Sequence, residues 1–177
     1  MLSACGGLAL RFLRTVALAA VALGGAAAQA TEPLPTIEMF VPSPCLACID
    51  YAEHLRRAGF SVTLTERDEA GMAKVTRWLN VPSAVESRQT AKIGSYFIEG
   101  HVPAEDIVQL LKERPLARGL AVPGLPRGAP GREQSSPTCE TACTMLDRES
   151  GISDVRRELF DTLLVGGDGK ARIWARH

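Results

Sequence analysis

Two pairs of cysteines are the residues of this sequence best suited to chemistry. Cys45 and Cys48 are separated by two residues, and Cys139 and Cys143 by three. Thiolates are the nucleophiles of disulfide exchange and the preferred ligands of soft metal ions. Each pair is therefore a candidate redox dithiol, soft-metal chelate or inert disulfide. A fifth cysteine, Cys5, lies in the N-terminal segment that we expect to be cleaved. The other four permit three disulfide pairings, between which the sequence does not choose.

Cys45 and Cys48 lie where an extended segment turns into a helix. The apolar run at residues 37–41 predicts a strand, and a Pro-Ser-Pro turn follows it. Apolar residues spaced by four and three after Cys48 predict a helix that ends at Gly59. The N–H groups and partial positive charge at a helix N-terminus stabilise a thiolate and lower a thiol pKa. This pair is the first-choice site.

Cys139 and Cys143 form the second-choice site. Their spacing of four would place both sulfurs on one face of a helix, close enough to share a metal ion. A local disulfide, or a disulfide with the first pair, fits the same spacing.

The remaining pattern predicts an α/β fold with a mixed sheet flanked by helices. Residues 115–137 contain five prolines and four glycines, which predict an extended arm with neither a helix nor a central strand. We expect a domain at residues 31–114, this arm, and a Cys-containing segment at residues 138–177 that packs on the same domain. Further strands are expected at 60–65, 90–93 and 96–99, further helices at 67–79 and from Pro103, and a C-terminal hairpin at 162–165 and 170–175.

Residues 1–30 have the pattern of a secretory signal peptide. Arg11 and Arg14 precede an uncharged apolar run that ends in Ala-Gln-Ala before Thr31. We expect cleavage there, a periplasmic or secreted protein, and no membrane span after cleavage. The 20 basic and 20 acidic residues of the full chain give no net charge, so nucleic acid is not an expected partner.

Hydrolases and nucleotide-binding proteins are excluded by missing motifs, since the sequence has no G-x-S-x-G, H-E-x-x-H or Walker-type segment. Three histidines remain as candidate ligands. His54 should point away from the sulfur face of its helix, and His177 could bind metal only adventitiously. His101 precedes a helix, where it could reach a nearby site or cap that helix.

Several segments together resemble an exported metal-binding family, the domain of unknown function 411 family. They are Ser43-Pro44-Cys45, His54-Leu55, Gly59-Phe60, the run Glu99 to Ile107, Arg114-Pro115, Gly119 to Pro126 and Gly128 to Gly131. The resemblance covers most of residues 37–131 and resumes at 160–177. It implies a periplasmic, thioredoxin-like protein that binds copper through a C-x-C-C motif at the first helix and a later Cys-His pair.

This chain departs from the family pattern at three ligand positions. Ala47 stands where the middle cysteine is expected, and Arg88 and Gln89 replace the Cys-His pair. A multi-copper cluster is not expected, because Cu(I) needs soft donors. Two interpretations of the first cysteine pair remain. In both of them, the positive charge of Arg88 would favour thiolate anions.

In the first interpretation, Cys45 and Cys48 bind a single soft ion, copper as Cu(I), and Cys139 and Cys143 complete its coordination. The second is a thioredoxin-like thiol-disulfide oxidoreductase that has lost metal. A third hypothesis is a non-catalytic module whose Pro/Gly-rich arm binds an envelope protein.

Overall fold

Strands and helices are mixed along the chain as far as residue 113, and the described residues after it add three strands. The structure, a computed structural model, describes residues 33–132 and 158–177, which lie within one compact unit, Pro33–His177. The elements are β1 (Ile37–Pro42), α1 (Leu46–Arg57), β2 (Val62–Arg67), α2 (Glu69–Trp78), the 3-10 helix η1 (Ser83–Val85), β3 (Thr90–Ile93), β4 (Tyr96–Glu99), α3 (Ala104–Glu113), β5 (Ala117–Ala121), β6 (Asp161–Gly166) and β7 (Ala171–Arg176).

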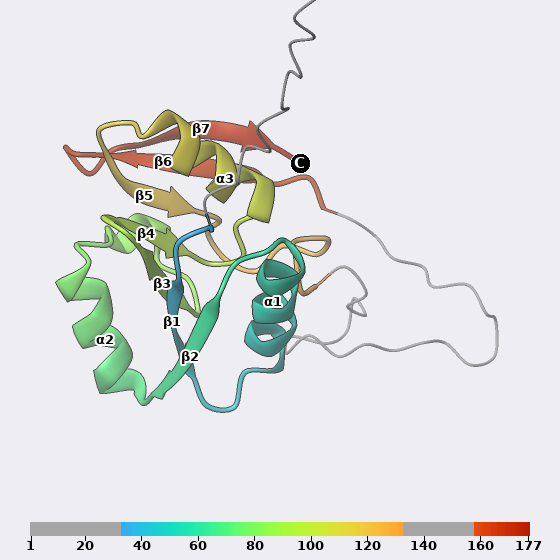
Figure 1. Ribbon diagram of the computed structural model, residues 1–177. Coiled ribbons are helices and arrows are strands. Elements are labelled where there is room, and N and C mark those ends of the chain that lie inside the picture. Colours follow the sequence, from blue (N-terminus) through green and yellow to red (C-terminus); the bar gives the residue numbers. More distant parts are fainter. Residues whose placement is uncertain (1–32, 133–157) are drawn as a thin grey trace, which may run out of the picture. The chain divides into compact units, whose positions relative to one another are not determined.

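The seven strands of the described residues belong to one mixed sheet, in the order β2-β1-β3-β4-β5-β6-β7 (Figure 1). The pairs β1–β2 and β4–β5 are parallel, and the other neighbouring pairs are antiparallel. The predicted α/β class, mixed sheet, flanking helices and C-terminal hairpin are confirmed. The narrower assignment to a thioredoxin-like fold stays a prediction.

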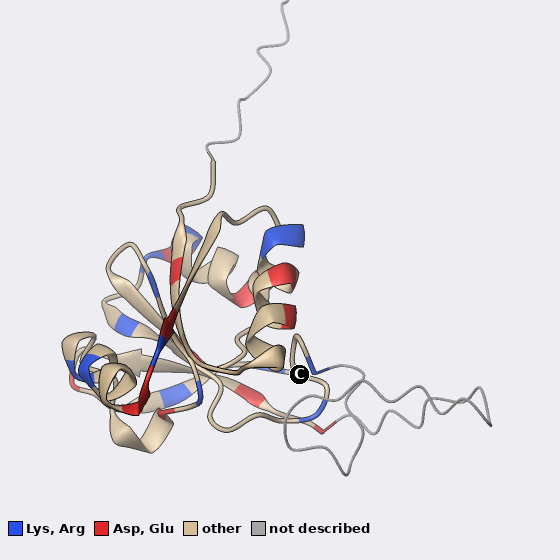
Figure 2. Ribbon diagram, turned by 90° about the horizontal axis from the view of Figure 1, so that it is seen from below, with Lys and Arg blue, Asp and Glu red and all other residues tan. Residues whose placement is uncertain are grey.

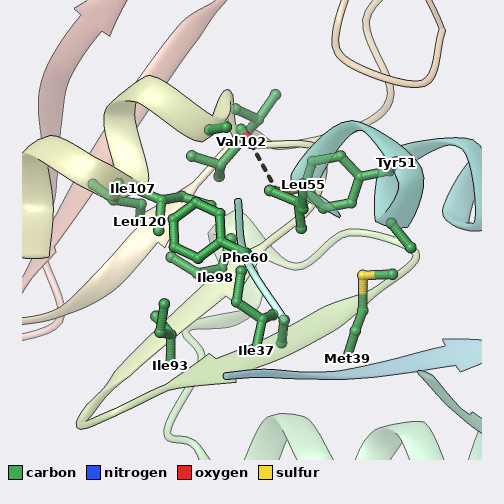
Figure 3. Packing of buried hydrophobic residues seen from close by; sticks show 14 of the residues in the cluster. Ile37, Met39, Tyr51, Leu55, Phe60, Ile93, Ile98, Val102, Ile107 and Leu120 are labelled. Atoms are coloured by element: carbon green, nitrogen blue, oxygen red, sulfur yellow. Dashed lines mark hydrogen bonds between the residues drawn. The ribbon is translucent and has the colours of Figure 1, made fainter. Parts of the chain in front are cut away.

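Alternating strand residues divide the core between the two faces of the sheet. On one face, Ile37 and Met39 of β1 pack with the buried sides of α1 and α3 (Figure 3). Phe97, whose neighbour Ile98 faces that first cluster, belongs with Val85 to a smaller cluster on the other face. Figure 1 shows α2 across the sheet from α1. The cysteine pair therefore sits over the larger half of the core.

One expectation about the Pro/Gly-rich arm is wrong. Residues 117–121 form β5, which lies inside the sheet between β4 and β6. All five prolines of the segment fall outside this strand, so composition averaged over the whole segment concealed it. Gly119 permits the close pairing, because a Cβ there would lie 2.0 Å from the carbonyl oxygen of Phe97. Residues 122–132 contain neither helix nor strand.

Charged residues of both signs are interspersed over the helices and strands (Figure 2). This distribution accompanies the zero net charge of the sequence. Within the described ranges, no helix combines the length and apolar character that crossing a membrane requires.

Candidate functional site

The first cysteine pair forms a disulfide at the start of α1. The Cα atoms of Cys45 and Cys48 are 5.3 Å apart. Cys45 is the N-cap residue, and its Sγ accepts the Cys48 N–H at 3.3 Å. Cys45 is partly exposed, whereas Cys48 is 0% exposed beneath the helix. Only the Cys45 sulfur can therefore be reached from outside.

Once reduced, this position favours a thiolate at Cys45. The Cys48 N–H already points at the Cys45 sulfur, and the first turn of α1 contributes its unpaired N–H groups and partial positive charge. A thiolate accepts such a hydrogen bond better than a neutral thiol does. The geometry thus suits the nucleophile of disulfide exchange and a soft-metal ligand equally.

A cavity of about 260 Å³ opens beside Cys45. Its walls come from the turn before α1, the first turn of α1 and three loops distant in sequence, and most of them are apolar. The lining residues are Pro44, Cys45, Leu46, Ala47, Arg88, His101 and Leu125. Arg88 is exposed and contributes a positive charge to this lining. A ligand in the cavity would meet the reachable sulfur, an apolar wall and one imidazole.

His101, which lines this cavity, is held rigidly. Its side chain is 1% exposed, its ring stacks on Tyr51 with centroids 4.7 Å apart, and Nδ1 lies 2.6 Å from the carbonyl oxygen of Pro130. A carbonyl can only accept, so Nδ1 carries the ring hydrogen and Nε2 is a bare acceptor. Nε2 has no hydrogen-bond partner among the described residues. Burial lowers the pKa of His101 from 6.5 to about 4, although the Pro130 bond opposes the change, so the ring is neutral.

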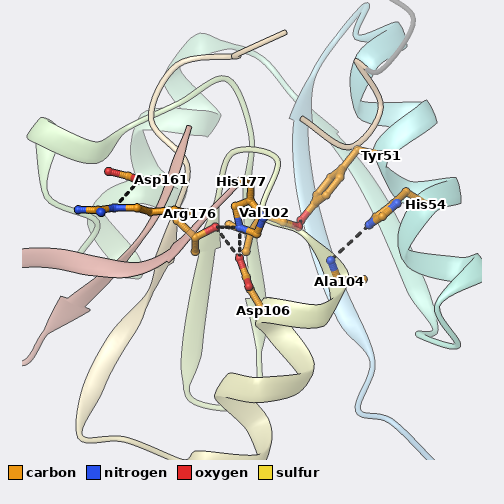
Figure 4. Close-up of polar contacts among 9 residues, drawn as sticks. Tyr51, His54, Val102, Ala104, Asp106, Asp161, Arg176 and His177 are labelled. Carbon is orange, nitrogen blue, oxygen red and sulfur yellow. Dashed lines mark hydrogen bonds and ion pairs between the residues drawn. The ribbon is translucent and has the colours of Figure 1, made fainter. Parts of the chain in front are cut away.

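Tyr51 and His54 link α1 to the loop that carries His101 (Figure 4). The Tyr51 hydroxyl donates to the carbonyl oxygen of Val102 at 2.8 Å, and burial raises the Tyr51 pKa, so the phenol remains protonated. His54 Nε2 accepts the N–H of Ala104, the first residue of α3, at 3.3 Å. His54 therefore serves packing and the start of α3 and is not among the residues that line the cavity.

The other sequence-predicted residues fall in three places. Cys139 and Cys143 lie outside the described residues. Arg88 lines the cavity, whereas Gln89 is buried with its Nε2 donating to the carbonyl oxygen of Gly100 at 3.0 Å. His177 Nε2 lies 2.9 Å from Oδ2 of Asp106 in the first turn of α3 (Figure 4), and His177 is not among the residues that line the cavity.

Within residues 33–132 and 158–177, no group of three or more His, Cys, Asp or Glu side chains is arranged to hold a metal ion. The described part of the chain thus offers at most the two cysteine sulfurs as a chelate. Tyr51 and Leu125 were missed by the sequence reasoning. Tyr51 could have been found, because it lies three residues after Cys48 on the same buried face. Leu125 carried no such signal, since it belongs to an irregular segment.

The chain is similar to one family model and to two solved structures. The family model described as "Protein of unknown function, DUF411" matches residues 85–132. Two solved structures of a copper resistance protein CopG, form 1 and form 2, are each 33% identical to this chain. The match with form 1 covers 81% of this chain and 98% of the form 1 chain, with a TM-score of 0.63. The match with form 2 covers 82% of this chain and 99% of the form 2 chain, with a TM-score of 0.64. Comparison with curated proteins gives no match.

Proposed function

Because the chain belongs to the DUF411 family, together with the copper resistance protein CopG, we propose that it handles copper and binds Cu(I) through the reduced thiols of Cys45 and Cys48. The observation that carries the proposal is the position of the two sulfurs. They are adjacent at the N-terminus of α1, and one of them borders a cavity. Soft thiolates select Cu(I) over harder ions.

The donor set fits a single ion better than a cluster. Ala47, Arg88 and Gln89 occupy positions where the resemblance leads us to expect two cysteines and a histidine. Arg88 lines the cavity, and a guanidinium cannot act as a ligand because it stays protonated. Copper is therefore proposed as cargo held by two thiolates from α1, after reduction of the disulfide.

Cys139 and Cys143 are proposed as a second pair of thiolates for the same ion. The segment that carries them begins beside α1, because a Cβ at Gly131 would lie 2.8 Å from the Tyr51 backbone nitrogen. The other end of that segment adjoins the same loop, since the Glu158 N–H donates to the Arg127 carbonyl oxygen at 2.8 Å. One end of the segment therefore begins beside α1, and the other returns to the loop of residues 122–132 that contacts α1, which supports the proposal.

The test is a competition titration of the reduced protein with Cu(I) against a chromophoric chelator under anaerobic conditions. We expect the reduced wild type to take up one equivalent. The C45S/C48S double variant should bind it much more weakly, because only the thiols of Cys139 and Cys143 remain. The oxidised wild type is the matched control, because its disulfide leaves no thiolate at α1. Uptake by the double variant equal to that of the reduced wild type would refute the proposal.

A second proposed function is thiol-disulfide exchange, and the unequal exposure of the two sulfurs favours it. Cys45 can be attacked or can attack, while the buried Cys48 can resolve a mixed disulfide from within. The reduced wild type should reduce a disulfide-linked model peptide, and C45S should not. Equal rates for both proteins would contradict this function.

We propose export to the periplasm, with cleavage before Thr31. The basis is the pattern of residues 1–30. Protein recovered from the periplasmic fraction should begin at Thr31 by mass spectrometry. Recovery of the uncleaved chain from the cytoplasm alone would overturn this proposal. Binding of an envelope protein by residues 115–137 stays a prediction.

A further inference from the structure

His101 presents a polar atom for which the described part of the chain supplies no partner. Five buried side-chain atoms share this property there: Gln89 Oε1, Thr90 Oγ1, Glu99 Oε2, His101 Nε2 and Trp174 Nε1. Among their residues, His101 is the one that lines the cavity beside Cys45. A buried acceptor without a donor costs about 1–3 kcal/mol, so a donor that enters the cavity gains by meeting Nε2.

The cavity lining restricts which donor that is. Pro44, Leu46, Ala47 and Leu125 make the wall mostly apolar, which disfavours ammonium groups and strongly hydrated donors. A thiol is a small apolar group with a weak S–H donor. It is also the donor that can react with a disulfide sulfur, and Cys45 forms part of the same wall.

We propose that this cavity receives a thiol, R–SH, whose S–H donates to His101 Nε2 while its sulfur meets the Cys45 sulfur. The inference rests on disulfide exchange at Cys45, the second function proposed above. Nδ1 bonds the Pro130 carbonyl oxygen, and the His101 ring stacks on Tyr51. Rotating the imidazole so that Nε2 points elsewhere would break both contacts. His101 is then a binding residue for the incoming thiol.

The exchange balances with the thiol as reductant. The R–SH sulfur forms a bond to Cys45 Sγ, and the Cys45–Cys48 bond breaks. Cys48 leaves as a thiolate and takes the proton that the incoming thiol gives up. A second R–SH attacks the mixed disulfide, releases R–S–S–R and leaves Cys45 as a thiol. Two thiols are thus oxidised, and the protein disulfide is reduced.

The experiment compares two reductants on the oxidised full-length mature protein. One is 2-mercaptoethanol, which carries an S–H donor, and the other is a water-soluble trialkyl phosphine, which cleaves disulfides without one. The rate is followed as loss of the Cys45–Cys48 disulfide by mass spectrometry of the peptide that contains it. The ratio of thiol rate to phosphine rate cancels changes in general access to Cys45.

Two variants separate hydrogen bonding at Nε2 from the structural role of His101. H101N keeps an amide donor near the Nδ1 position for Pro130 and removes the Nε2 acceptor. H101Q places an amide group near the Nε2 position. We expect H101N to lower the thiol-to-phosphine ratio about fivefold, the worth of one hydrogen bond. H101Q should restore most of the ratio, and H54N, at a histidine that is not part of the cavity lining, should leave it unchanged.

An unchanged ratio in both His101 variants would overturn the inference. A wild-type disulfide that phosphine reduces and no thiol reduces would instead refute exchange at Cys45 itself. A cysteine peptide with flanking leucines, used in place of 2-mercaptoethanol, identifies the source of the thiol. A faster, His101-dependent reaction supports a polypeptide cysteine, and an equal His101-dependent rate supports a small thiol.

Discussion

Glu99, the last residue of β4, should make the stability of this protein depend on pH in an unusual direction. Its side chain is 0% exposed, and one carboxylate oxygen accepts the Ser87 N–H. Burial raises the pKa of Glu99 from 4.5 to about 7, although the neighbouring Thr90 hydroxyl and the Ser87 N–H oppose the rise. At about 1.4 kcal/mol for each pKa unit, this gap corresponds to about 3 kcal/mol of unfolding free energy.

The direction in which stability changes with pH follows from proton binding. Between pH 4.5 and 7 the folded protein binds the Glu99 proton and the unfolded chain does not, so stability falls as the pH rises through about 7. His101 acts in the opposite direction, because its folded pKa of about 4 lies below 6.5. Its contribution is complete above pH 6.5 and is lost as the pH falls toward 4. In the wild type the two contributions largely cancel between pH 4.5 and 6.5.

The Glu99→Gln substitution removes the Glu99 contribution, so the pH dependence that comes from His101 becomes measurable. Gln imitates the neutral acid and can still accept the Ser87 N–H, so the variant should gain stability from pH 4 to 6.5 and then hold it. At pH 8 it should exceed the wild type by up to about 3 kcal/mol. Urea unfolding of the oxidised proteins from pH 4 to 8 measures this, with the exposed Glu86→Gln as control. Parallel profiles for Glu99→Gln and wild type across this range would refute the reasoning.

Three further results are expected. In the reduced protein, Cys45 should be alkylated with a midpoint below that of free cysteine, about pH 8.5, because α1 stabilises the thiolate; a midpoint at that value would contradict the helix effect. Cys139→Ser should weaken Cu(I) affinity without altering thermal unfolding, and unchanged affinity would confine the ligands to α1. Gly119→Ala should destabilise the fold by about 1–3 kcal/mol in urea unfolding, because the new Cβ meets the Phe97 carbonyl oxygen. Gly167→Ala, which has no neighbouring atom within 4 Å, should not, and equal losses would show that β5 does not require the close approach.

Local patterns in the sequence were sufficient for most of the fold. The apolar spacing after Cys48 predicted α1, whose buried face carries Ala52 and Leu55. The alternation at residues 60–65 predicted β2 with a shift of two residues, because Phe60 packs in the core before the strand begins. β5 was missed because five strand residues are flanked by prolines, and its place depends on pairing with β4 and β6, which no local pattern records.

Of the candidate site, only the adjacent cysteine pair at the start of α1 was predictable from the sequence. The Cys-x-x-Cys spacing and the turn before α1 predicted two adjacent sulfurs at a helix start. The other cavity walls come from Arg88, His101 and Leu125, which lie on three separate loops. Their meeting depends on the order of the strands, so a single sequence could indicate Arg88 and His101 as candidates without placing either.

The central claim is that Cu(I) binds to sulfur at the start of α1. X-ray absorption at the copper K-edge, on reduced protein loaded with one equivalent of Cu(I), tests it most directly. A first shell of sulfur scatterers that loses the two sulfurs of α1 in C45S/C48S is the expected result. A shell of nitrogen and oxygen scatterers in the wild type, or a sulfur shell of unchanged coordination number in C45S/C48S, would contradict the claim.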